Sequence, residues 1–249
     1  MPRAIKAVTL DCWGTLLLDG PGSDDRYRRR RLATVGTLLG EAGVPASSAG
    51  LSRAYDELAR RLGRLWRDCK DVPVGEHVRI LLESLDAGLA ERLPPEVRAA
   101  IERAYAEPAL LAPPAVDPGA ATALPALARQ GLALAVVSNT AHTPGAVLRQ
   151  VFERAGVLAP LRVLTFSDEC GVRKPHPGIF ELTLRRLGVA PHEAVHVGDD
   201  PVLDVEGAID AGLVAIQVSP DGRATAPVKP AAVITGLGEL PGALGRLGA

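Results

Sequence analysis

The strongest constraint on the fold is a set of short apolar runs that are each followed directly by polar residues. The five clearest runs are Ala4–Leu10, Leu132–Val137, Arg162–Phe166, Ala194–Val197 and Leu213–Val218. They are rich in Val, Leu and Ala without strict apolar–polar alternation, a pattern typical of parallel strands covered on both faces. Ala231–Ile234 is a sixth candidate strand.

Helical patterns separate the later strands. They cover Pro144–Ala155, Pro177–Leu187 and Val202–Ala211. Alternation of strands and helices predicts an α/β fold, a Rossmann-like doubly wound parallel sheet. In such a sheet, ligands bind at the carboxyl ends of the strands, where the polar residues of this chain follow the apolar runs.

Residues 19–116 interrupt this alternation of strands and helices directly after the first strand. The segment is rich in arginine, and leucines recur at helical spacing, for example at Leu58, Leu62 and Leu65. A proline-rich stretch, Leu111–Gly119, reads as the return linker. We therefore expect a core formed by residues 1–18 and 117–249, and an inserted α-helical domain formed by residues 19–116.

The composition excludes several classes of function. The chain has 249 residues and a net charge of −1, so its overall charge does not favour binding to nucleic acid or to an anionic membrane. Its three cysteines include no CxxC pair, which fits a reducing compartment. The N-terminus reads as a strand and not as a signal peptide, and no apolar run approaches the roughly 18 residues of a membrane span. We expect a cytoplasmic monomer or homodimer with a small-molecule substrate.

The first strand ends in Asp11, which Gly14 and Thr15 follow closely. A carboxylate at this edge is a candidate nucleophile that forms a covalent intermediate. Gly14 permits a tight turn in which backbone amides face a bound anion. The alternative is that Asp11 only caps the turn that follows it.

Two further strand ends carry candidate anion-binding groups. Ser138 and Asn139 form either an oxyanion or phosphate clamp or the N-cap of the next helix. Lys174 is one of only four lysines, and its ammonium suits an anionic substrate and a carboxylate nucleophile. The alternative for Lys174 is an exposed loop position, and we interpret His176 as a loop residue.

Three aspartates follow the strand Ala194–Val197: Asp199, Asp200 and Asp204. Clustered carboxylates repel one another and Asp11 unless a cation is bound. Oxygen ligands alone favour Mg²⁺ over zinc. N-capping of the following helix is the alternative for Asp199 or Asp200, and it is compatible with a metal site.

Together these segments resemble the haloacid dehalogenase superfamily of hydrolases. The resemblance rests on Asp11-x-x-Gly14-Thr15-Leu16, Ser138-Asn139, Lys174-Pro175, and Gly198-Asp199 with Asp204 five positions on. It covers essentially the whole chain and implies a Rossmann-like core with a mobile helical cap inserted after strand one. It also implies hydrolysis through an aspartyl-enzyme intermediate.

The resemblance implies a role for each matching residue. Asp11 is the implied nucleophile, and Ser138 and Lys174 hold the transferring group. Asp199 is the implied direct Mg²⁺ ligand, together with Asp11 and the backbone carbonyl of Trp13. Asp204 or Asp200 is implied to act on the metal through a water.

Trp13 departs from the family pattern. Phosphatases of the family usually place a second aspartate there, as general acid and then base. The only polar group of tryptophan is a donor with no useful pKa, so Trp13 cannot transfer these protons. General acid–base catalysis is worth about 10²–10⁴-fold, so we expect substrates with good leaving groups to be favoured over alkyl phosphates.

Four functions therefore stay open, and a Mg²⁺-dependent phosphohydrolase is the main hypothesis. A 2-haloacid dehalogenase fits Trp13, because an aromatic residue is frequent there and halide leaves without a proton. Asp199 opposes it, because relatives of that type are metal-free and place Ser or Asn at that position. Phosphonatase-like chemistry would require Lys70, the only lysine of residues 19–116, to form an imine. The fourth is a catalytically weak binding or regulatory protein.

The run Arg26–Arg31 contains five arginines. One interpretation is a solvated helix face, and the other is that one or two of them clamp an anionic substrate. We expect Tyr55 and Trp66 to pack in the core of the inserted domain.

Overall fold

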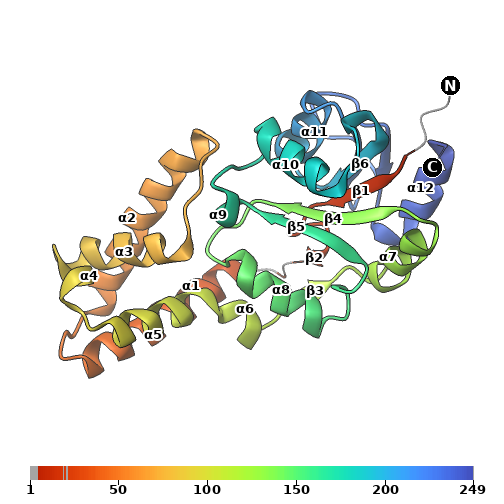
Figure 1. The fold of residues 1–249 in the computed structure, drawn as a ribbon. Coiled ribbons are helices and arrows are strands. Elements are labelled where there is room, and N and C mark those ends of the chain that lie inside the picture. Colours follow the sequence, from red (N-terminus) through yellow and green to blue (C-terminus); the bar gives the residue numbers. More distant parts are fainter. Residues whose placement is uncertain (1–4, 19, 21, 249) are drawn as a thin grey trace.

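The computed structural model describes residues 5–18, 20 and 22–248. Within them, six parallel strands form one sheet in the order β5-β4-β1-β6-β7-β8 (Figure 1). The strands are β1 (Ala7–Leu10), β4 (Ala133–Ser138), β5 (Leu161–Phe166), β6 (Ala194–Gly198), β7 (Val214–Val218) and β8 (Ala232–Ile234). The predicted α/β fold is confirmed. Ala4, the first residue of the first predicted strand, lies outside the described residues.

Strand β1 lies at the centre of the sheet, between β4 and β6. Leu10 pairs with Val136 on one side and with Val197 on the other. The chain extends from β1 to β4 and β5, then returns to β6 on the opposite side of β1. This reversal is the switch point at which doubly wound sheets bind ligands, and Asp11 lies directly on it.

Helices cover both faces of the sheet. On one face, α7 (Ala120–Arg129), α8 (Gly145–Arg154) and α12 (Leu240–Arg246) pack on an apolar cluster that includes Val8 and Leu10. On the other face, α10 (Pro177–Leu187) and α11 (Gly207–Asp210) pack on a second cluster, which includes Ala7. Short elements complete the core: α9 (Ser167–Cys170), η1 (Pro191–Glu193) and η3 (Leu237–Glu239).

The helix predicted over Val202–Ala211 is two elements. A π-helical segment, η2 (Pro201–Glu206), precedes α11. The Asp200 side chain caps η2 by accepting from the amides of Val202 and Leu203, each at 2.8 Å. The wider π-helical turn, a feature frequent at functional sites, carries Asp204.

A separate helical lobe lies to one side of the sheet (Figure 1). Its helices are α1 (Ser23–Glu41), α2 (Ser48–Arg67), α3 (Val74–Leu85), α4 (Leu89–Arg92), α5 (Pro95–Ala106) and α6 (Pro108–Leu111). Helices α1 to α5 enclose an apolar cluster of their own, which contains Tyr55 and against which Trp66 packs, whereas Ala109 of α6 belongs to the cluster of the sheet. A two-stranded antiparallel ribbon, β2 (Leu17–Leu18) with β3 (Ala115–Val116), lies where the chain passes between lobe and sheet.

The segment between α2 and α3 also docks the lobe directly onto the core. The Asp71 amide donates to the Gly171 carbonyl, and the Arg173 amide donates to the Cys69 carbonyl. The buried Asp71 carboxylate accepts from the Arg173 guanidinium and from the Ser167 hydroxyl, both at 2.5 Å. The lobe is therefore bound to the residue that immediately precedes Lys174.

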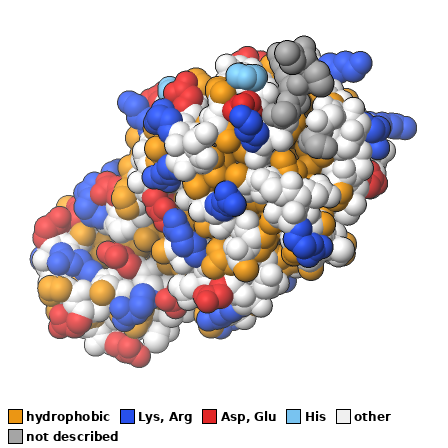
Figure 2. All heavy atoms as spheres, turned by 45° about the vertical axis from the view of Figure 1, so that its right-hand side comes forward, with side chains coloured by type: hydrophobic (Ala, Val, Ile, Leu, Met, Phe, Trp, Pro, Cys, Tyr) orange, Lys and Arg blue, Asp and Glu red, His pale blue; other side chains and the backbone are white. Residues whose placement is uncertain are grey.

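Charged side chains of both signs are intermixed on the face of the molecule shown in Figure 2. This mixture agrees with the net charge of −1. Among the described residues, the helices are all too short or too polar to cross a membrane.

Candidate active site

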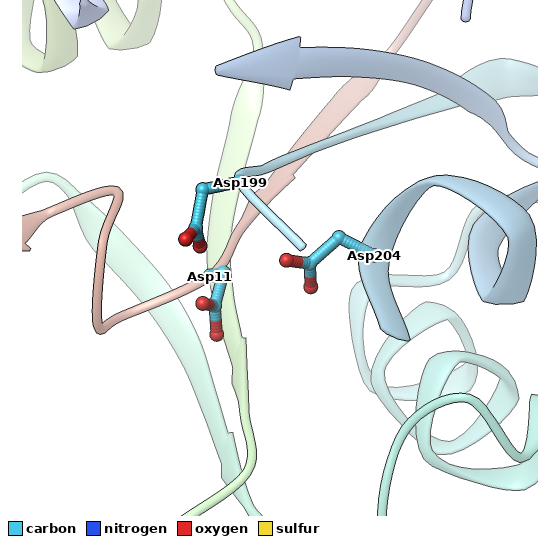
Figure 3. Close-up of side chains that lie close together, drawn as sticks. All are labelled: Asp11, Asp199 and Asp204. Atoms are coloured by element: carbon cyan, nitrogen blue, oxygen red, sulfur yellow. The ribbon is translucent and has the colours of Figure 1, made fainter. Parts of the chain in front are cut away.

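Three carboxylates converge at the carboxyl edge of the sheet (Figure 3). Asp11 follows β1, Asp199 follows β6, and Asp204 lies on η2. One oxygen from each lies within 4.8 Å of the others. The structure thus brings together three residues that are separated by up to 193 positions in the sequence (204 − 11).

Lys174 is buried between two of these carboxylates. Its Nζ lies 2.5 Å from Asp11 Oδ1 and 2.6 Å from Asp204 Oδ1. Burial disfavours the ammonium, but the two carboxylates outweigh this effect and raise the pKa of Lys174 above its usual range. One fixed positive charge therefore faces three acidic groups.

Asp204 is surrounded by donors. Besides Lys174, the His196 Nε2 lies 3.1 Å from Oδ1, and the Asp200 amide donates to Oδ2 at 2.9 Å. Burial by itself would raise the pKa of Asp204, but Lys174 and the hydrogen bond from His196 hold it well below its usual range. Asp204 is thus the carboxylate of the cluster that stays ionised.

The pKa values of the other two carboxylates, Asp11 and Asp199, are both raised. Burial raises the pKa of Asp11 to about 7, with Lys174 opposing and Asp204 adding to the rise. Burial and the charge of Asp204 raise the pKa of Asp199 to about 6. The cluster therefore has too little positive charge for all its carboxylates, the condition that favours a bound cation.

Two glycines leave the space in which these carboxylates sit. A Cβ on Gly14 would lie 2.3 Å from Asp199 Oδ2, and a Cβ on Gly198 would lie 2.2 Å from Asp204 Cγ. Gly14 also has a φ of +77°, which other residues rarely adopt. Its amide donates to the Leu17 carbonyl at 2.8 Å, so this N–H closes the turn that follows Asp11.

Two buried hydroxyls near Asp11 and Asn139 have unused hydrogen-bonding capacity. Among the described side chains, Thr15 Oγ1 and Ser138 Oγ are buried atoms with no hydrogen-bond partner. Such groups are normally satisfied, and each exception calls for an explanation such as a missing ligand. Their position at the switch point makes them candidates to donate to the oxygens of a bound anion.

Asn139 is engaged by the backbone of Lys174. Its Nδ2 donates to the Lys174 carbonyl at 3.0 Å, and its Oδ1 accepts from the Lys174 amide at 2.8 Å. The geometry supports a positioning role, because the carboxamide fixes the backbone that carries the ammonium. The substrate-binding role predicted for Asn139 stays a prediction.

A cavity of about 240 Å³ opens beside the carboxylates and is lined by Trp13, Asn139 and Lys174 as well as by the acidic residues. Trp13 also lines a second cavity, together with Arg31 of α1. Within the run Arg26–Arg31, Arg31 is buried, whereas Arg28 pairs with Asp56 at 2.7 Å. Lys70 is exposed and lines neither cavity.

Sequence reasoning missed the groups that support the site. His196 lies inside β6 and contacts Asp204; a histidine within an otherwise apolar strand is the signal that could have found it. The contact between Asp71 and Arg173 spans 102 residues, and no local pattern indicates it.

Sequence reasoning also missed a group of rings between lobe and sheet. The Tyr105 hydroxyl lies 2.6 Å from His142 Nδ1, and the His142 ring packs 5.1 Å from the Tyr55 ring and 6.0 Å from the His77 ring. Burial lowers the pKa of His77 to about 4 and that of His142 to about 3. Both rings are therefore neutral in the folded protein near neutral pH.

Comparison with known proteins identifies relatives over most of the chain. A family model described as haloacid dehalogenase-like hydrolase matches residues 5–212. Phosphoglycolate phosphatase of Rhodospirillum rubrum is 31% identical over 217 residues, which cover 86% of this chain and 79% of that protein. Phosphoserine phosphatase of Thermus thermophilus is 40% identical over 90 residues, but the match spans only 36% of this chain and 35% of that protein.

A solved structure shares the whole architecture. The 2-haloacid dehalogenase of Pseudomonas syringae pv. Tomato superposes with a TM-score of 0.69 and 26% sequence identity. The superposition covers 97% of this chain and 99% of that one.

The neutral His142 ring predicts a pH dependence of stability. A histidine of the unfolded chain takes up a proton near pH 6.5, whereas His142 resists protonation down to about pH 3. The unfolded state therefore binds more protons, and the free energy of unfolding falls as the pH drops below about 6.5. For His142 we expect a loss of about 3 kcal/mol between pH 7 and pH 4.5.

Urea unfolding at pH 7.0 and 4.5 measures this loss. His142→Gln keeps an acceptor for the Tyr105 hydroxyl but does not titrate, so it should lose correspondingly less stability over the interval. His192→Gln, at an exposed histidine, is the matched control and should behave like the wild type. An identical loss in His142→Gln and the wild type would contradict the prediction.

Proposed function

The chain belongs to the haloacid dehalogenase-like hydrolases, and we propose that it is a Mg²⁺-dependent phosphohydrolase that acts on a small phosphorylated metabolite. The observation that carries the proposal is the convergence of Asp11, Asp199 and Asp204 within 4.8 Å of one another. The relatives named phosphoglycolate and phosphoserine phosphatases support a small phosphate ester as substrate.

The donor set suits Mg²⁺. Three carboxylates offer only oxygen ligands, which this ion prefers, and Gly14 leaves the space that Asp199 occupies. Asp11 and Asp199 would bind the ion directly with the Trp13 carbonyl, and Asp204 would act through a water, because its oxygens already accept from Lys174, His196 and the Asp200 amide. When bound, the ion supplies charge neutralisation and orients the phosphoryl group.

Asp11 is the proposed nucleophile. Its carboxylate attacks phosphorus, the bond between phosphorus and the ester oxygen breaks, and an aspartyl-phosphate forms. Lys174 stabilises the negative charge at the phosphoryl oxygens. The hydroxyls of Thr15 and Ser138 donate hydrogen bonds to the same oxygens. Water then attacks the phosphorus of the intermediate, which releases inorganic phosphate and restores Asp11.

Trp13 limits the two proton transfers that this reaction requires. The leaving oxygen needs a proton unless it is stable as an anion, and the attacking water must lose one. Trp13 can do neither, although it lines the cavity beside Asp11. We therefore propose that substrates with good leaving groups react fastest.

The helical lobe is the proposed cap, with residues 19–116 as the cap and residues 1–18 and 117–249 as the core. Closure of a lid over a phosphoryl-transfer site excludes water and adds contacts for specificity. The Asp71–Arg173 contact links the position of the lobe to the backbone that carries Lys174. A cytoplasmic location and a monomer or homodimer stay predictions.

Dehalogenation of a 2-haloacid is the second candidate. The solved dehalogenase structure and the aromatic residue at position 13 favour it. Asp199 opposes it, because without a bound metal ion a carboxylate substrate would meet three carboxylates that only Lys174 compensates. Two unit charges about 4 Å apart repel by about 4 kcal/mol at an effective dielectric constant of 20.

The test is phosphate release from acetyl phosphate and p-nitrophenyl phosphate, with Mg²⁺ or with EDTA. Both substrates have good leaving groups and do not need the missing acid. We expect turnover by the wild type with Mg²⁺, and a loss of at least 10³-fold with EDTA or in Asp11→Asn, because either change removes a group that contacts the phosphoryl group. Halide release from 2-chloropropionate in EDTA, without any phosphate release, would contradict the proposal and establish the second candidate.

Gly14→Ala tests the metal site separately from the nucleophile. The added Cβ would displace Asp199, so the Mg²⁺ concentration for half-maximal turnover of p-nitrophenyl phosphate should rise at least tenfold. Gly43→Ala is the matched control, because Gly43 has a φ of +78° but nothing within 4 Å of its Cβ position. Equal Mg²⁺ requirements in the two variants would show that Asp199 does not hold the ion.

Trp13→Asp tests the missing general acid. It should raise turnover of an alkyl phosphate such as ethyl phosphate at least tenfold, since general acid–base catalysis contributes about 10²–10⁴-fold. Trp13→Asn removes the same ring without supplying an acid and serves as the control. If the two variants turn over ethyl phosphate equally while still requiring Mg²⁺, position 13 does not limit the chemistry.

A further inference from the structure

A second cavity of about 250 Å³ shares Trp13 with the cavity of the candidate active site. Its walls include Tyr27 and Arg31 of α1, and His142 and Thr143 from the loop that follows β4. Two segments connect it to the carboxylate cluster: one runs from Asp11 to Trp13, and the other from Asn139 to Thr143. The volume suits a group of a few heavy atoms, since drug-sized ligands occupy about 300–1,000 Å³.

The chemistry of this cavity is dominated by Arg31. The residue is only 3% exposed, and its side chain is a guanidinium cation with five N–H donors and no acceptor. Nε donates to the Tyr105 carbonyl at 2.7 Å, and Nη2 donates to the Thr143 hydroxyl at 3.2 Å. These acceptors are neutral, and no ion pair joins Arg31 to a carboxylate of the described chain.

A buried cation without a counter-ion is costly, so it marks a place where an anion would be stabilised. Other buried cations of this protein are paired: Lys174 with Asp11 and Asp204, and Arg173 with Asp71. Arg31 differs from these paired cations in its surroundings. The rings of Tyr27 and Tyr105 lie within 5.9 Å of its guanidinium and carry no negative formal charge.

One carboxylate does line the same cavity. Asp24 lies seven residues before Arg31 on α1, which corresponds to about 10.5 Å along the helix, and it is exposed. An anion in the cavity is therefore repelled at the Asp24 end and attracted at the buried Arg31 end. His142, which also lines the cavity, is neutral and adds no competing charge.

We infer that this cavity binds a second anionic group of the substrate, with Arg31 as its ligand. The inference rests on the proposed phosphohydrolase function and narrows its substrate class to short phosphate monoesters that carry a carboxylate or a second phosphate. The phosphoryl group would lie at Asp11, the chain would pass Trp13, and the second anion would meet the guanidinium. Arg31 thereby acts as a specificity-determining residue.

The test compares kcat/KM for matched pairs of esters. Phosphoglycolate against phosphoglycolamide changes only a carboxylate into a neutral amide, and ethylene glycol bisphosphate against ethylene glycol monophosphate isolates a second phosphate. Hydrogen bonds to charged groups contribute enough for a preference of about 10- to 100-fold for the charged member. The pair with the larger ratio identifies the anion as a carboxylate or a phosphate.

Arg31→Met should reduce that ratio to within about threefold of unity. Arg53→Met, at an exposed arginine on α2, is the matched control and should keep the wild-type ratio. Circular dichroism checks the fold of each variant. If Arg31→Met does not fold, Arg31→Lys keeps a charge but loses the planar fork, and the ratio should still fall severalfold.

Two results would overturn the inference alone. One is a wild-type protein that hydrolyses p-nitrophenyl phosphate but shows no preference within either pair, and the other is a preference that survives in the folded Arg31 variant. Absence of any Mg²⁺-dependent phosphate release, from p-nitrophenyl phosphate or acetyl phosphate, would overturn the proposed function and this substrate class together.

Discussion

The structure depends on holding three carboxylates around one buried ammonium. Lys174 lies within 2.6 Å of both Asp11 and Asp204, and Asp199 completes the cluster. Several otherwise unrelated features serve this arrangement. Asn139 fixes the Lys174 backbone from both sides, and His196 and the Asp200 amide donate to Asp204. Two glycines leave the required space. The remaining excess of negative charge is what makes the site suited to a divalent cation.

The lobe and the sheet meet at the residue next to this ammonium. Arg173 pairs with Asp71 of the lobe, and its guanidinium stacks 4.4 Å from the centre of the Trp66 ring. Lys174, the following residue, contacts Asp11, the proposed nucleophile. A shift of the lobe therefore acts on the backbone that positions the ammonium. The same interface lines the Arg31 cavity, so the proposed second anion site and the charged cluster lie on neighbouring residues.

Much of this site could be predicted from the sequence, because parallel strands bring their carboxyl ends to one edge. Asp11, Ser138 and Asp199 each follow an apolar run, and the sheet order explains why they meet. The partners of these residues could not be predicted. Asn139 faces the Lys174 backbone and the π-helical turn carries Asp204, and both outcomes depend on tertiary packing. The sequence left open whether the five arginines form a solvated helix face or whether one or two of them face a cleft, and only packing selects Arg31.

In the proposed mechanism, Asp11 carries the phosphoryl group during turnover. Because Trp13 cannot activate water, the aspartyl-phosphate should persist long enough to be trapped. Acid quenching at short times after mixing with acetyl phosphate and Mg²⁺, followed by mass spectrometry of the peptide that contains Asp11, measures this directly. We expect a phosphoryl group on Asp11 that is absent in EDTA. Release of phosphate at full rate with Asp11 unmodified at every time point would contradict it.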